Sequence, residues 1–142
     1  MHEAKAIRPG NGQRGGVVIY VVDDEPMLLE LTSVILEPLG YTVETFNSPD
    51  TALRAFQGAE SLPSLIITDF TMQTMSGLDL LEACRKIRPG QKAVLVTGTI
   101  APDVLRDAPV QPNRYLTKPY HAKELIDVVE AVLAESAGSG ER

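Results

Sequence analysis

Cysteines, histidines and long apolar runs are scarce in this sequence. Cys84 is the only cysteine among 142 residues, so no intramolecular disulfide can form, which fits a reducing compartment. The two histidines, His2 and His121, are far apart in the sequence and do not suggest a zinc site. No apolar run approaches the roughly 20 residues of a membrane-spanning helix. Residues 1–16 are polar and glycine-rich, unlike a secretory signal. We therefore expect a cytoplasmic protein with no membrane partner.

Positive charge is also in short supply. The chain has 13 Lys and Arg against 19 Asp and Glu, which gives a net charge of −6. Lys5, Arg8 and Arg14 against Glu3 give residues 1–16 a charge of +2, so residues 17–142 carry −8. A body of this charge repels phosphate backbones, which argues against direct nucleic-acid binding, but it suits metal cations.

The length and composition are those of one globular domain. Hydrophobic residues make up 44% of the chain and charged residues 23%, which argues against a disordered chain. The polar ends predict a flexible leader at residues 1–16 and a flexible tail at residues 136–142. The single domain is therefore expected at residues 17–135.

Strand and helix patterns alternate along that domain. Five short apolar runs predict strands at residues 17–22, 42–46, 65–68, 93–96 and 114–117. Three of these runs are nearly continuous in apolar residues, as strands buried on both faces are. Helices are predicted at residues 26–39 with Gly40 as the stop, after Ser48-Pro49, before Pro89-Gly90, and over the apolar stripe from Leu125 to Leu133. The prolines before the last strand leave room only for a short or irregular fourth helix near residues 102–107. This order predicts a doubly wound α/β fold with helices on both faces of a parallel sheet.

Charged and hydroxyl side chains stand where four of the predicted strands end. Asp23 and Asp24 follow the first strand, Asp69 the third, Thr97 the fourth and Lys118 the fifth. Sites in open α/β sheets lie at the carboxyl ends of the strands. An acid there is by itself usually a turn former or a helix cap. The combination predicts a shared pocket.

The chemistry of these side chains favours phosphoryl transfer. Three carboxylates in one pocket repel one another unless a cation is present, and hard oxygen ligands favour Mg²⁺ or Mn²⁺. A carboxylate such as Asp69 can attack phosphorus and form an aspartyl phosphate. Lys118 and the cation can neutralise charge, and the Thr97 hydroxyl can donate to a phosphoryl oxygen.

Four segments, VVDDEP, TDFTMQTMSG, VTG and YLTKP, resemble the receiver domain of two-component response regulators. The resemblance covers about residues 17–135 and implies a flavodoxin-like sheet of strand order 2-1-3-4-5. It implies a histidine kinase or histidine phosphotransfer protein as phosphodonor, an unknown downstream protein and a possible weak homodimer. It also implies that the chain is not an enzyme beyond catalysing its own phosphorylation and dephosphorylation.

The metal and acceptor positions are carried over by this resemblance. Asp69 matches the phospho-accepting aspartate. Asp24 matches a direct metal ligand, and Asp23 matches a ligand that acts through water. The backbone carbonyl of Thr71 matches the remaining protein ligand.

The switch positions follow in the same way. Thr97 matches the hydroxyl residue that moves toward the phosphate, and Lys118 matches the lysine that pairs with it. Tyr115 matches the aromatic residue that changes rotamer on activation, although without the resemblance it would be interpreted as a surface strand residue. The sequence departs from the family at Gln73, where a proline is common. The shortened fourth helix alters the surface through which the family usually dimerises.

Four other interpretations compete with this one. A small aspartate-based phosphatase needs a second aspartate two residues after the first, and Glu25 stands two residues after Asp23. A flavin-type carrier needs a Ser, Thr or Gly-rich phosphate loop where the acidic DDEPM stands. A degenerate receiver would lack an active-site position, and none is lacking. A receiver cut from a hybrid histidine kinase stays open as an alternative.

Overall fold

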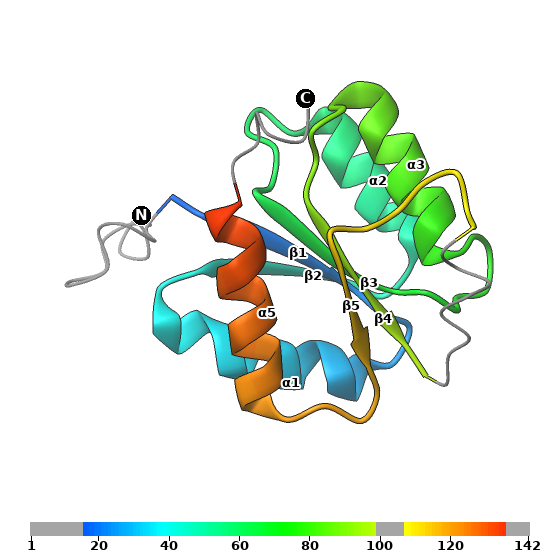
Figure 1. Cartoon of the computed structure of the whole chain (residues 1–142). Coiled ribbons are helices and arrows are strands. Elements are labelled where there is room, and N and C mark those ends of the chain that lie inside the picture. The colour runs from blue at the N-terminus through cyan, green and yellow to red at the C-terminus, as the bar shows by residue number, and fades with distance from the viewer. Residues whose placement is uncertain (1–15, 99–106, 136–142) are drawn as a thin grey trace.

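A five-stranded parallel sheet forms the centre of the protein (Figure 1). The structure is a computed structural model that describes residues 16–98 and 107–135. The strands are β1 (Val18–Val22), β2 (Thr42–Phe46), β3 (Leu65–Asp69), β4 (Ala93–Thr97) and β5 (Arg114–Thr117). They lie side by side in the order β2-β1-β3-β4-β5, and every pairing is parallel. The predicted strand order is confirmed.

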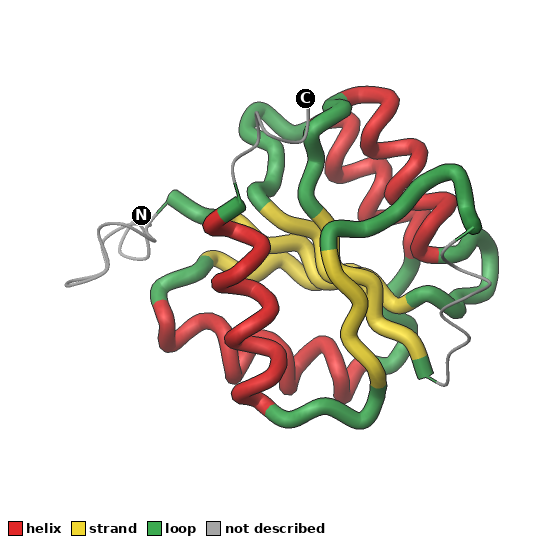
Figure 2. Tube along the Cα trace, in the orientation of Figure 1, coloured by secondary structure: helices red, strands yellow, loops and turns green. Residues whose placement is uncertain are grey.

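Helices cover both faces of the sheet (Figure 2). They are α1 (Pro26–Leu36), α2 (Pro49–Gly58), α3 (Gly77–Ile87) and α5 (Ala122–Ala134), with a short 3₁₀ helix η2 (Glu37–Leu39) after α1. Helices α1 and α5 lie on one face, and α2 and α3 lie on the other (Figure 1). The predicted three-layer sandwich is therefore present.

Two apolar cores separate the layers. On one face, side chains of α1 and α5 such as Leu36 and Val129 pack against Ile19 and Val94 of the sheet. On the other face the core is built from α2, α3 and the sheet, and its buried members are Tyr20, Val22, Ala52, Phe56, Ile66, Leu80 and Cys84. Strands β3 and β4 are buried along their whole length, because helices cover both of their faces. Cys84, which belongs to this second core, is a buried free cysteine.

Some predicted boundaries were wrong. The helix predicted over residues 26–39 ends at Leu36 and continues as η2, because Pro38 has no N–H with which to continue the α-helical hydrogen bonds. Gly40 ends the segment in the left-handed region, with φ 102°, as predicted for a glycine stop. The first strand starts one residue later than predicted. Strands β3 and β4 each run one residue further, so Asp69 and Thr97 belong to the strands themselves.

Some predictions fall outside the described residues. These are the leader up to residue 15, the tail at residues 136–142 and most of the short fourth helix predicted near residues 102–107. The last residue of that helix prediction, Asp107, is described and stands in a turn. Within the part of the chain that is described, no helix has the length and apolar character required to cross a membrane.

Candidate functional site

The strand order reverses between β1 and β3, and the acidic side chains gather at this point. Strand β1 lies between β2 and β3, so the connections that leave β1 and β3 run to opposite faces of the sheet. Val22 pairs with Thr68, which places the following residues, Asp23 and Asp69, next to each other at the carboxyl edge. The sheet topology therefore brings together two acids that are 46 positions apart in the sequence.

Asp23, Asp24 and Asp69 form one carboxylate cluster. Each offers a carboxylate oxygen, and these three oxygens lie within 4.8 Å of one another. Asp23 and Asp69 are both only 7% exposed, whereas Asp24 faces solvent. The cluster is thus buried on one side and open on the other.

Lys118 supplies the positive charge of the site. Its Nζ lies 3.1 Å from Asp69 Oδ1 and 3.7 Å from Asp23 Oδ2. Its backbone N–H donates to the carbonyl of Thr97 at 2.8 Å, which continues the pairing of β5 with β4 past the end of the strand. The peptide bond between Lys118 and Pro119 is cis. Lys118 therefore contacts two of the three acids from the far side of β4.

Backbone hydrogen bonds hold the two buried aspartates in place, and one of them reaches the carboxylate of Asp23. The N–H of Glu25 donates to Asp23 Oδ1 at 2.9 Å, and the N–H of Asp23 donates to the carbonyl of Phe46 at 3.1 Å. The N–H of Phe70, directly after Asp69, donates to the carbonyl of Val96 at 2.8 Å. Both acids are therefore held by the sheet and its first loop residues rather than by a mobile loop.

Burial and crowding shift the pKa values of these groups. Burial raises the pKa of Asp69 and of Asp23, and neighbouring carboxylates add to the effect, although Lys118 opposes it. Burial alone would lower the pKa of Lys118. The hydrogen bond to Asp69 and the surrounding negative charges outweigh that effect, so this pKa is raised. The charged forms of the two carboxylates are thus destabilised, and a bound cation would offset their repulsion and their burial.

The donor set of this cluster fits a hard divalent cation. It consists of carboxylate oxygens from three aspartates, with no cysteine or histidine among them. Mg²⁺ and Mn²⁺ prefer such oxygens. Thr71, predicted to contribute its backbone carbonyl, lies two residues beyond Asp69 in the β3–α3 loop.

Close packing at Gly77 positions this loop. The N–H of Gly77 donates to the carbonyl of Phe70 at 2.9 Å. A Cβ at Gly77 would lie 2.4 Å from the backbone oxygen of Asp69 and 2.7 Å from Leu95 Cδ1. No local sequence pattern predicts this role of Gly77, because the approach of α3 to β3 depends on tertiary packing.

The start of α3 carries a second signal that the sequence analysis missed. The N–H of Asp79 donates to Ser76 Oγ, and the N–H of Ser76 donates to Asp79 Oδ2, both at 3.1 Å. This is a capping box, and Ser followed three residues later by Asp could have revealed it.

The two predicted switch residues lie on the neighbouring strands. Thr97 ends β4 and is buried, one position beyond the pairing of Asp69 with Val96. Tyr115 pairs with Leu95 and is 36% exposed, and its hydroxyl donates to Gln111 Oε1 at 2.7 Å. Tyr115 therefore stands away from the carboxylate cluster in this conformation.

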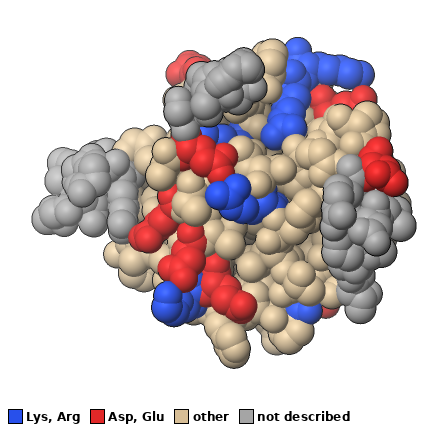
Figure 3. Space-filling model, viewed as in Figure 1, with Lys and Arg blue, Asp and Glu red and all other residues tan. Residues whose placement is uncertain are grey.

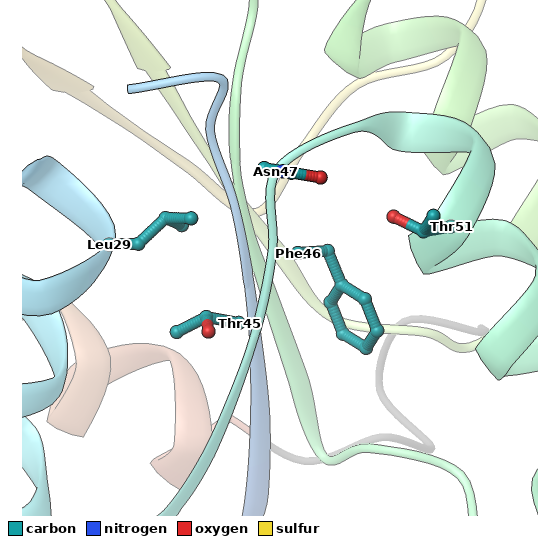
Figure 4. Close-up of a pocket in the computed structure, with 5 residues that line it drawn as sticks. All are labelled: Leu29, Thr45, Phe46, Asn47 and Thr51. Carbon is teal, nitrogen blue, oxygen red and sulfur yellow. The ribbon is translucent and has the colours of Figure 1, made fainter. Parts of the chain in front are cut away.

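A separate hollow of about 370 Å³ lies at the end of β2, between α1 and α2 (Figure 4). It is lined by Leu29, Thr45, Phe46, Asn47 and Thr51. None of the predicted site residues lines it. Phe46 belongs to the wall and also packs on Tyr20, with ring centroids 4.8 Å apart.

The sheet order and the acidic cluster together define a receiver-type α/β signalling domain. The family model described as "Response regulator receiver domain" matches residues 19–130. The chain therefore belongs to the response regulator receiver domain family of two-component signalling.

Curated relatives of the chain are response regulators. It is 31% identical over 128 residues to the probable transcriptional regulatory protein TcrX of Mycobacterium tuberculosis, covering 89% of this chain and 53% of TcrX. It is 32% identical over 120 residues to the response regulator receiver protein CpdR of Brucella abortus, covering 82% of this chain and 95% of CpdR. The chain spans about half the length of TcrX but nearly all of CpdR.

Solved structures agree with this family. The crystal structure of a CheY-like response regulator receiver domain protein from Methanospirillum hungatei has a TM-score of 0.75 and 29% sequence identity. The match covers 82% of this chain and 93% of that one. The flavodoxin-like receiver fold predicted from the sequence is confirmed.

Proposed function

We propose that Asp69 accepts a phosphoryl group from a phosphohistidine and that this modification switches the protein's interactions with other proteins. The observation that carries the proposal is the contact of Asp69 Oδ1 with Lys118 Nζ at 3.1 Å inside the carboxylate cluster. Asp23 is a poorer acceptor, because its Oδ1 accepts a hydrogen bond from the Glu25 N–H and its Oδ2 lies 3.7 Å from Lys118 Nζ, farther than Asp69 Oδ1.

The charges of this site support phosphoryl transfer to Asp69. An Asp69 oxygen forms a bond to phosphorus while the bond from phosphorus to the donor imidazole nitrogen breaks, and that nitrogen keeps the electron pair. The ammonium group of Lys118 offsets the added negative charge. Asp23, Asp24, Asp69 and the carbonyl of Thr71 would hold Mg²⁺ or Mn²⁺, which supplies further charge neutralisation when bound. The same charges would serve hydrolysis, in which a water oxygen forms a bond to phosphorus while the bond from phosphorus to the Asp69 oxygen breaks, which leaves the free carboxylate and inorganic phosphate.

Thr97 and Tyr115 would change conformation in response to phosphorylation of Asp69. The hydroxyl of Thr97 would donate to a phosphoryl oxygen on Asp69, and Tyr115 would follow by turning inward. Thr97 is buried on the strand next to β3, and Tyr115 is on the next strand again, which supports a relay from β3 across β4 to β5.

Intact-mass measurement tests the acceptor. Wild-type protein with Mg²⁺ and acetyl phosphate should gain one phosphoryl group, and hydroxylamine should remove it because it is an acyl phosphate. Asp69→Asn should gain none, whereas Asp127→Asn, a change at an exposed acid of α5, should label like the wild type. Equal labelling of Asp69→Asn would show that another residue is the acceptor.

The exposed face of α1 supports docking of the phosphodonor beside this pocket. Met27, Leu31 and Val34 are 74%, 48% and 61% exposed, and their spacing places them on one face of the helix. Helix α1 begins at Pro26, two residues after Asp24, so this apolar stripe starts at the acidic edge. A helix of a histidine kinase or phosphotransfer protein that packs on the stripe would bring its phosphohistidine to Asp69.

Two exposed apolar residues allow a matched test of docking. Leu31 in α1 is 48% exposed, and Ile87 in α3 is 47% exposed. Leu31→Asn should slow transfer from a histidine kinase that phosphorylates the wild type by about tenfold or more, a typical effect for an interface anchor. Labelling by acetyl phosphate should not change. Ile87→Asn should leave both rates unchanged, and an equal loss for both variants would rule out the α1 surface.

The acidic face around α5 argues against direct nucleic-acid binding by this chain. Figure 3 shows acidic side chains gathered over this helix, where Glu124, Asp127 and Glu130 are exposed. Such a surface repels phosphate backbones and suits a basic protein partner. We expect the downstream partner to be a protein, and a weak homodimer stays a prediction.

A further inference from the structure

A hydrogen bond to the segment that precedes β5 holds Tyr115 in its outward position. Its hydroxyl donates to Gln111 Oε1 at 2.7 Å. Tyr115 pairs with Leu95 on β4, and Thr117 pairs with Thr97, so Tyr115 stands two positions away from Thr97 along the same face of the sheet. An inward turn of the ring toward Thr97 must break the bond to Gln111.

Gln111 is itself fixed at two other points. Its side-chain amide donates to the carbonyl of Ala108 at 2.9 Å, and its own carbonyl accepts from Arg85 Nη1 at 2.7 Å. Pro109 and Pro112 on either side of it restrict the backbone φ angles. The acceptor for the Tyr115 hydroxyl is therefore not free to follow the ring.

Arg85 anchors this segment to the rest of the fold. Its Nε donates to the carbonyl of Gln91 at 3.0 Å, and its Nη2 lies 3.4 Å from Asn113 Oδ1. Asn113 Oδ1 also accepts from the backbone N–H of Ala93 at the start of β4. The segment is thus tied to α3 and to β4.

We propose that Gln111 is a positioning residue that latches Tyr115 outward and so sets how much phosphorylation is needed to switch the protein. The proposal rests on the switching role of Tyr115 proposed above. A typical net hydrogen bond favours the outward rotamer about fivefold. Any change at Asp69 that favours the inward ring must first overcome this preference, and by linkage an inward ring strengthens what binds at Asp69.

Affinity for a phosphoryl mimic tests the latch. The probe is beryllofluoride with Mg²⁺, titrated onto the full chain. Gln111→Ala should tighten its binding by up to about fivefold, because the outward rotamer loses the hydrogen bond to Gln111. Tyr115→Phe removes the donor hydroxyl, so adding Gln111→Ala to it should change the affinity little further.

A second variant separates the latch from loosening of the segment. Gln111→Glu keeps an acceptor for the Tyr115 hydroxyl but loses the donor to Ala108, so its affinity should not exceed that of the wild type. The latch is wrong if Gln111→Ala and Gln111→Glu tighten binding equally, or if Gln111→Ala binds like the wild type. It is also wrong if Gln111→Ala tightens binding in the Tyr115→Phe background as much as in the wild type.

A direct reading of the ring is independent of chemistry at Asp69. Protein labelled with 3-fluorotyrosine should show the ¹⁹F resonance of Tyr115 shifted in Gln111→Ala without any ligand, with Tyr115→Phe identifying the resonance. An unchanged resonance overturns the latch. Failure of the wild type to bind beryllofluoride instead overturns the phosphoryl-accepting role of Asp69, and the fluorine resonance still decides whether Gln111 holds the ring.

Discussion

Replacing Gly77 by alanine should damage both the fold and the site, because no space exists for a methyl group. The new Cβ would lie 2.4 Å from the backbone oxygen of Asp69, and ordinary contacts begin at 3.4 Å. The start of α3 and the end of β3 must therefore separate by about 1 Å, taking 3.4 Å as the closest ordinary contact. Overpacking of this kind costs about 1–3 kcal/mol of unfolding free energy.

The net effect on stability is somewhat smaller, because alanine restricts the unfolded chain more than glycine does. That gain is about 0.4–1 kcal/mol, so we expect a net loss of about 1–2 kcal/mol for Gly77→Ala. Gly58 at the end of α2 provides the matched control, since nothing lies within 4 Å of the position of its added Cβ. Gly58→Ala should therefore stabilise the protein by about 0.4–1 kcal/mol.

Gly77→Ala should also slow phosphorylation, because the atom nearest to the added Cβ is the backbone oxygen of Asp69. The backbone of Asp69 must shift, and its carboxylate would then leave the 3.1 Å contact with Lys118. A displacement of about 1 Å in a reacting group costs up to about 100-fold in rate. We expect phosphorylation by acetyl phosphate to slow by about 10- to 100-fold in Gly77→Ala and to stay unchanged in Gly58→Ala.

Urea unfolding and time-resolved intact-mass measurement give the two readouts. The reasoning is refuted if Gly77→Ala is as stable as Gly58→Ala. It is also refuted if Gly77→Ala is destabilised but phosphorylated at the wild-type rate, because the clash would then be relieved without moving Asp69.

Three further predictions concern charge and capping. Burial raises the pKa of Asp69 and of Asp23. Between the ordinary aspartate pKa and these raised values, the folded state therefore binds more protons than the unfolded state. The metal-free unfolding free energy should then fall as the pH rises through that window. Asp69→Asn should therefore be more stable than the wild type in urea at neutral pH without metal, and this difference should shrink as the pH falls toward the ordinary value. Mg²⁺ at ten times its Kd should raise the unfolding free energy of the wild type by about 1.4 kcal/mol. Asp24→Ala should lose this gain and Asp127→Asn should keep it, so an intact gain in Asp24→Ala would contradict the metal assignment. Ser76→Ala should cost about 1 kcal/mol in urea unfolding through loss of the cap on α3, and a smaller cost for Ser33→Ala, inside α1, is the expected comparison.

The sequence by itself determined the order of the elements and the chemistry at the strand ends. Nearly continuous apolar runs identified strands covered on both faces, and the residues after them identified Asp23, Asp24, Asp69 and Lys118 as one set. These signals are local, because apolar periodicity and the residue at the end of a strand can be read from neighbouring positions.

Only the tertiary structure decided how close these groups lie and which contacts constrain them. The distance of 3.1 Å between Lys118 and Asp69, the lack of space at Gly77 and the bond from Tyr115 to Gln111 all depend on how the elements pack. Helix α3 can approach β3 only where a glycine stands. The segment before β5 is held by Arg85, which lies 26 positions earlier than Gln111 in the sequence. Contacts of this kind arise from packing between distant segments, and no local pattern encodes them.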